Sequence, residues 1–209
     1  MNFIFDCGDC HIAKKRLLSF DIPELLINSS IYIIPMVNPD GVEIVHNGND
    51  IWQANAQGID LNHNYPAKWK ECKQLEINSG IVNPGPTRFG GDYPAQAPEV
   101  TAIINFVQKH NFIRAVALHS QGKEIYWNFA GLEPATALPF ANALSKVSRY
   151  AVATPTEIAS CGGFKDWFIQ EYHNEGYTIE VGEGKNPLPL SQYGEIYEDL
   201  LPMLIMCAM

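Results

Sequence analysis

The sequence predicts an α/β fold in which a mixed, largely parallel sheet carries helices on both faces. Two short apolar runs, residues 115–118 and 177–182, have the length and β-branched content of buried strands. Amphipathic segments alternate with such runs, which indicates strands joined by helices. With 209 residues, 46% hydrophobic and 18% charged, the chain suits one domain spanning residues 1–209.

The first half of the chain is expected to contain little regular structure. Residues 1–28 favour two helical pieces, residues 31–37 a short buried strand limited by Pro35, and residues 38–41 a turn. Residues 47–98 are rich in Asn, Gly and Pro, and long irregular segments of this kind often form binding walls.

The second half alternates helices and strands in a regular way. In order, the expected elements are a helix at 97–110, a strand ending at His119, a strand at 123–129, a helix at 136–153, a helix at 162–172, the strand carrying Glu180, and a last helix from about Ser191.

Composition narrows the class of partner. Lys+Arg 14 against Asp+Glu 23 gives a net charge of -9 without a basic cluster, so nucleic acid is not expected as a partner. The apolar tail at 200–209 is about half the length of a bilayer span, and the first ten residues do not resemble a signal peptide. An odd, irregularly spaced set of cysteines favours reduced thiols and a cytoplasmic location: Cys7, Cys10, Cys72, Cys161 and Cys207.

His119 and Glu180 are the candidate chemical groups. Ligands gather at the carboxyl ends of parallel strands, where both residues lie. A carboxylate in an apolar strand must be paired, protonated or directed into a cleft, so the two suggest a metal or acid–base site. A catalytic zinc ion uses three protein ligands, and His119 is the one evident ligand in the sequence. Alternatively, His119 is a structural residue held by hydrogen bonds.

Two nucleophiles compete with this interpretation. Ser120 follows His119, but it lacks a Gly-x-Ser-x-Gly elbow, and adjacent strand residues point to opposite faces. Cys161 precedes a glycine pair that opens a helix, where a thiol is acidified, but no histidine is evidently placed to serve it. Residues 58–66 also contain several polar and turn-forming residues close together. A functional site and turn formation explain this cluster equally well.

Ordered motifs identify a resemblance to the carboxypeptidase A-like zinc metallopeptidases. They are Asn-Pro-Asp-Gly at 38–41, Gly-Ile-Asp-Leu-Asn-His-Asn at 58–64, Gly90-Gly91 with Pro98-Glu99, Leu-His-Ser at 118–120, Gly162-Gly163 with Asp166-Trp167, and Ile-Glu-Val-Gly at 179–182. The sequences of residues 119–127, 164–169 and 184–189 resemble those of the bacterial γ-D-glutamyl-L-diamino acid endopeptidase I branch, whose members act on peptidoglycan stem peptides.

The resemblance implies a role for each matching residue. His119 would bind Zn²⁺, and Glu180 would activate water and pass its proton to the leaving amine. Asp60 would hydrogen-bond a ligand histidine, and Asn62 with His63 would hold a substrate carboxylate. A peptide, such as a cell-wall stem peptide, is the implied substrate.

Several positions depart from the family pattern. His63 replaces an arginine, Gln57 or Gln53 stands where a second arginine is expected, and Ile158 replaces a tyrosine. The His-x-x-Glu motif that supplies two zinc ligands is absent from the 209 residues and would precede Met1, so we expect an N-terminally truncated domain that binds zinc poorly. A non-catalytic peptide-binding descendant of the same fold is the alternative.

Overall fold

The computed structural model describes residues 16–17, 20–21, 27, 29–156 and 161–209. Its central feature is a four-stranded sheet with the order β3-β6-β4-β5. The strands are β3 (Arg114–His119), β4 (Glu124–Tyr126), β5 (Ala151–Ala153) and β6 (Glu175–Glu180). The pairs β3–β6 and β4–β5 are parallel, whereas β4–β6 is antiparallel. The sheet is therefore mixed and largely parallel, as predicted.

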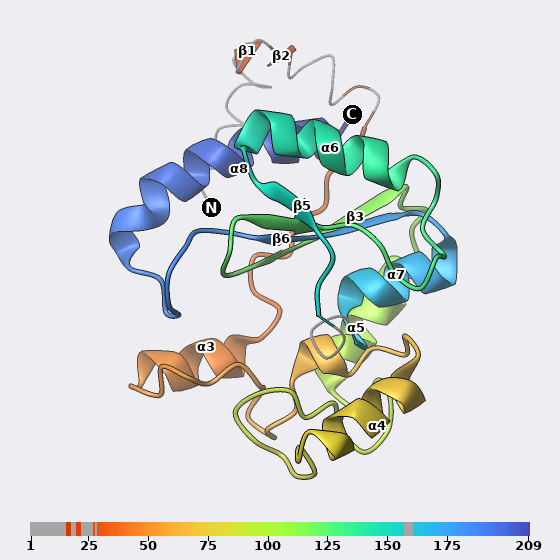
Figure 1. The fold of residues 1–209 in the computed structure, drawn as a ribbon, viewed down its shortest axis with the longest axis vertical. Helices are drawn as coiled ribbons and strands as arrows, with labels where there is room; N and C mark the ends of the chain where they lie inside the picture. Colours follow the sequence, from red (N-terminus) through yellow and green to blue (C-terminus); the bar gives the residue numbers. More distant parts are fainter. Residues whose placement is uncertain (1–15, 18–19, 22–26, 28, 157–160) are drawn as a thin grey trace.

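Helices cover both faces of the sheet (Figure 1). One face carries α6 (Ala137–Ser148) and α8 (Tyr193–Cys207), packed on a core that includes Ile125, Tyr177 and Ile179. The other face carries α5 (Pro98–Val107) and α7 (Phe164–Tyr172), packed around Trp167 and Phe168. Alternation along β6 explains this division, because successive strand side chains point to opposite faces.

The strand that ends at His119 differs from its prediction in burial. Its apolar sequence predicts a buried strand, but β3 lies at the edge of the sheet among the described residues. Leu118 is 49% exposed as a result. One backbone edge of β3 has no neighbouring strand here, whereas β6 has one on each side.

The predictions for the first forty residues are mostly wrong where the structure describes them, although Ile27 is helical as expected. Within the expected helical region, β1 (Arg16–Leu17) and β2 (Phe20–Asp21) form a short antiparallel pair, since short helices have little stability of their own. Residues 31–37 form no strand, because no described backbone pairs with them. Residues 38–41 begin α3 (Pro39–His46), where the Asn38 side chain accepts a hydrogen bond from Gly41 N. Asparagine is a favoured helix cap, so this motif starts a helix rather than making a turn.

Two later elements also differ. The expected irregular region contains η1 (Leu61–His63) and α4 (Trp69–Asn78), a helix that begins after Lys68 without a side-chain cap and so lacks a start signal. The helix predicted to reach residue 153 ends as α6 at Ser148, because Arg149 adopts a left-handed conformation. Residues 190–192 form η2 (Leu190–Gln192) ahead of α8. In the part of the chain described, no helix has the length and apolarity needed to cross a membrane.

Candidate active site

His119 and Glu180 are brought together by strand register. The parallel pairing of β3 with β6 places the two residues directly side by side at the carboxyl ends of the strands. The chain beyond each strand is also joined, because Val181 N donates to His119 O at 2.7 Å and Gly122 N donates to Gly182 O at 2.9 Å. The sheet therefore fixes a histidine and a carboxylate next to each other at the edge where ligands are expected.

A second carboxylate, Glu124, faces Glu180 from the neighbouring strand. The antiparallel pairing of β4 with β6 sets Glu124 opposite Glu180, and residues so paired project to the same face. Tyr126 Oη donates to Glu124 Oε2 at 2.6 Å. Burial, and secondly the charge of Glu124, raise the pKa of Glu180 to about 7. A carboxyl group with this pKa can both accept and release a proton near neutral pH.

Removing the charge of Glu124 should lower the pKa of Glu180. In zinc-free Glu124→Gln, we expect that pKa to fall from about 7 toward 4.5 without reaching it, because burial remains the larger cause. Because the pKa of Glu180 is raised in the folded state, the free energy of unfolding falls as the pH rises from about 4.5 to about 7. This decrease should be smaller in Glu124→Gln than in the wild-type protein. A carboxyl ¹³C NMR titration measures the shift, with the exposed Glu183→Gln as control. An unchanged Glu180 titration would show that the two charges do not interact.

His119 is held in the neutral form suited to binding a metal. Burial lowers the pKa of His119, with the charge of Asp60 acting in the opposite direction and that of His63 in the same one. These charges act on His119 because η1 and its cap lie near the end of β3. Neutral imidazole is the form that ligates metals.

Asp60 begins the segment that carries the remaining predicted residues. Its Oδ1 accepts from Asn62 N at 3.2 Å, which caps η1, and its Oδ2 accepts from Arg88 N at 2.8 Å. Asp60 thus takes part in turn formation and also presents charge to His119. Its predicted contact with a ligand histidine stays a prediction. A functional role and turn formation, the two explanations for the polar residues at 58–66, are both compatible with the structure.

Asn62 and His63 are positioned by the start of α7. Asn62 Oδ1 accepts from Phe164 N at 3.1 Å, and Tyr65 N donates to Gly162 O at 2.9 Å. A Cβ at Gly162 would lie 2.9 Å from His63 O, and the residue has a φ of +74°. A glycine is therefore needed at this close approach.

The two candidate glutamines lie in different surroundings. Gln57 is exposed, and its backbone N donates to Asn55 Oδ1 at 3.1 Å. The hydroxyl of Thr87 lies 2.6 Å from Gln53 Oε1 and 3.3 Å from Asp60 Oδ2. Gln53 is therefore linked to the Asp60 network, although spacing alone could not separate it from Gln57. Ile158 lies outside the described residues.

The described residues do not by themselves make a complete zinc site. No group of three His, Cys, Asp or Glu side chains within residues 29–156 and 161–209 could hold a metal ion. A catalytic zinc ion requires about three protein ligands, and His119 supplies one.

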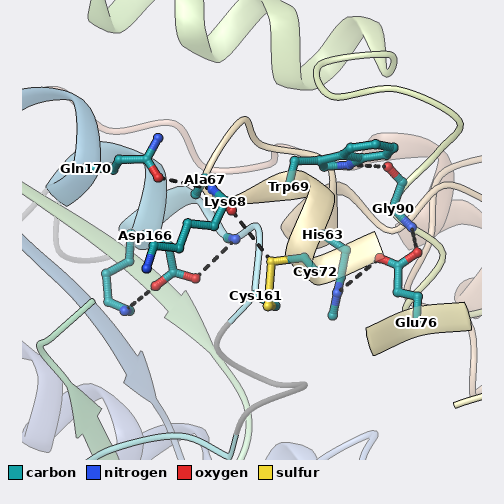
Figure 2. Close-up of a disulfide and its surroundings, with 12 residues drawn as sticks. His63, Ala67, Lys68, Trp69, Cys72, Glu76, Gly90, Cys161, Asp166 and Gln170 are labelled. Carbon is teal, nitrogen blue, oxygen red and sulfur yellow. Dashed lines mark hydrogen bonds and ion pairs between the residues drawn. A yellow bond between two sulfur atoms is a disulfide. The ribbon is translucent and has the colours of Figure 1, made fainter. Parts of the chain in front are cut away.

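The cysteines contradict the prediction of reduced thiols (Figure 2). Cys72 on α4 and Cys161 form a disulfide with a Cα–Cα distance of 5.2 Å. Cys161 is thus not a free nucleophile, because its sulfur is bonded. Cys207 is free, and Cys7 and Cys10 lie outside the described residues. Sequence spacing missed the bond because its partners are 89 residues apart.

Serine chemistry also finds no support at the strand end. The Ser120 hydroxyl donates to Asn186 Oδ1 at 3.0 Å, and Asn186 Nδ2 donates to Ser120 O at 2.9 Å. These contacts tie the two loops beside the site together. The carboxyl ends of β3 and β6 thus bring a histidine and a carboxylate together within an α/β fold, an arrangement that suits metal or acid–base chemistry.

Comparison with known proteins establishes the family. Residues 19–202 match the zinc carboxypeptidase family model, and the chain belongs to that family of metallopeptidases. It is 37% identical over 226 residues to γ-D-glutamyl-L-diamino acid endopeptidase 1 of Lysinibacillus sphaericus, covering 98% of this chain and 55% of that protein. A second relative, YqgT of Bacillus subtilis, is 36% identical over 88% of this chain and 54% of its own length. The chain thus spans about half the length of these relatives.

Solved structures support the fold. Bovine thrombin-activatable fibrinolysis inhibitor, solved with a tick carboxypeptidase inhibitor, superimposes with a TM-score of 0.69 at 22% identity, over 85% of this chain and 67% of its own. The murein-tripeptide amidase MpaA of Escherichia coli O157 gives 0.56 at 21% identity, over 81% of this chain and 65% of its own. The predicted zinc carboxypeptidase-like fold is confirmed.

Proposed function

We propose that this chain forms one domain of a metallopeptidase that acts on γ-D-glutamyl-diaminopimelate or related peptidoglycan stem peptides. The similarity to the Lysinibacillus endopeptidase supports the substrate class. The observation that carries the chemistry is the register of β3 and β6, which sets His119 beside Glu180. Zinc, the cofactor implied by the family, would polarise the scissile carbonyl, with His119 as a ligand from this chain.

Each remaining residue has a role in the proposal. Glu180 accepts a proton from the attacking water and delivers it to the leaving nitrogen, which its raised pKa allows. Asn62 and His63 bind a substrate carboxylate beside the strand ends. Asp60 fixes the local backbone and favours the orientation of a ligand histidine.

A non-catalytic peptide-binding protein of the same fold is the second candidate. It is favoured by the absence of a three-ligand cluster among the described residues. Glutamine in place of an arginine, at Gln53 or Gln57, also removes a permanent positive charge that would stabilise an oxyanion. Under this alternative, the chain binds the peptide and releases it intact.

Hydrolysis of a γ-D-glutamyl-diaminopimelate peptide, followed by mass spectrometry with and without added zinc, tests the proposal. We expect weak, zinc-dependent cleavage that a chelator abolishes. Glu180→Gln should reduce the rate by about 10²–10⁴-fold, since it removes the proton acceptor while keeping the shape.

The controls separate the candidates. Glu183→Gln changes an exposed carboxylate near the same strand end and should leave cleavage unchanged. Saturable binding of an uncleaved peptide would favour the non-catalytic alternative. If the protein neither bound nor cleaved the peptide, both candidates would be contradicted.

A further inference from the structure

Two buried polar atoms face each other between η1 and α4. Nδ1 of His63 lies 3.8 Å from Oε1 of Glu76, and the Glu76 side chain is 1% exposed. Neither atom has a hydrogen-bond partner among the described residues. Figure 2 shows the His63 ring and the Glu76 carboxylate directed at one another. A buried donor or acceptor without a partner is costly, so this pairing requires an explanation.

The other oxygen of Glu76 is fully engaged. Oε2 accepts from Lys73 Nζ at 2.9 Å and from Gly90 N at 3.1 Å. These two bonds hold the carboxylate plane and leave Oε1 directed toward the imidazole. Glu76 is therefore fixed in place independently of His63.

Gly90 makes the close approach possible. A Cβ at this position would lie 2.4 Å from His63 O and 2.6 Å from Glu76 Oε1. Any side chain at Gly90 would push apart the backbone of η1 and the end of α4. The glycine that the family motif includes thus allows a histidine and a buried glutamate to meet.

A proton on Nδ1 would point toward Oε1, but at 3.8 Å the two atoms interact by charge and orientation rather than through a hydrogen bond. With Nδ1 facing Glu76, Nε2 is the ring nitrogen left free to meet another partner. A histidine held in this way can present Nε2–H to an anionic group in one orientation. An arginine would do so without help, whereas a histidine needs an orienting partner.

We propose that Glu76 is the positioning residue for His63, and that it directs the imidazole toward the carboxylate of a bound peptide. This inference rests on the proposed function, in which Asn62 and His63 bind a substrate carboxylate. Glu76 touches no substrate itself and acts through the histidine. It thereby contributes to selection of peptides with a free carboxylate.

The first test is the ring of His63 in the free protein. In ¹⁵N NMR spectra, we expect the fraction of His63 rings with a proton on Nδ1 to be larger in the wild-type protein than in Glu76→Gln. The exposed Glu71→Gln makes the same change on the same helix and should leave the ring signals unchanged. Identical His63 signals in wild type and Glu76→Gln would overturn the proposal.

The second test is a double-mutant cycle on peptide affinity. With a γ-D-glutamyl-diaminopimelate peptide as probe, Glu76→Gln should weaken binding about tenfold when His63 is present and have no effect in His63→Ala. Equal weakening in both backgrounds would mean that Glu76 is merely structural and would overturn the proposal. An unchanged affinity in Glu76→Gln would do the same.

The two readouts also separate the inference from the proposed function. If the wild-type protein did not bind the peptide, the assigned substrate class would fall, and with it the role of Glu76 in peptide selection. The ¹⁵N spectra would still decide whether Glu76 orients His63. Binding together with unchanged ring signals would leave the proposed function intact and overturn only the role of Glu76.

Discussion

Replacing both Cys72 and Cys161 by serine is expected to lower the free energy of unfolding by about 2–5 kcal/mol. The disulfide joins residues 89 positions apart and so restricts the unfolded chain over a large part of its length. In the folded protein it holds α4 beside the segment that leads into α7 (Figure 2). Urea unfolding of the oxidised wild type and the double variant measures the difference.

Reductant provides the internal control for this prediction. It should shift the unfolding midpoint of the wild type toward that of the double variant and leave the double variant unchanged. If reductant shifted both proteins equally, the effect would not arise from this disulfide. If the double variant were as stable as the oxidised wild type, the crosslink would contribute nothing.

Trp167→Ala is expected to cost about 3–5 kcal/mol of stability. The indole is 2% exposed and stacks on Tyr65 at a centroid distance of 5.8 Å, with Tyr172 against it at 5.7 Å. The contact with Tyr65 links α7 to the segment that carries Asn62 and His63. Loss of the indole would leave a cavity between the helix and the site segment.

Two variants control for this change. Trp167→Phe keeps an aromatic ring and should cost clearly less than the alanine variant, whereas Tyr193→Ala removes a ring that is 52% exposed and should cost little. Thermal unfolding followed by circular dichroism ranks the three. Equal losses for Trp167→Ala and Tyr193→Ala would contradict the role assigned to this core.

The sequence determined the elements whose signals are local. The strands ending at His119 and Glu180, and the helices later seen as α5 and α7, follow from short apolar runs and from periodicity. Family motifs in order then identified the metallopeptidase class, which the family match confirms. Such signals survive in one dimension because each depends on residues a few positions apart.

Long-range contacts were decided by the tertiary structure alone. In the sequence, nothing distinguishes Glu124 and Glu76 from other charged residues. Strand register places Glu124 opposite Glu180. Helix packing places Glu76 against His63. The Cys72–Cys161 bond likewise depends on how α4 packs. Pairing partners distant in the chain leave no periodic signal, so these contacts could not be inferred beforehand.

His119 shows both contributions. Its residue type and its place after an apolar run marked it in the sequence, and the resemblance gave it a role. Only the folded sheet shows that β3 is an edge strand, that Glu180 stands beside His119, and that buried surroundings favour the neutral imidazole. The chemistry of a side chain is set by neighbours that the fold brings to it from distant parts of the chain.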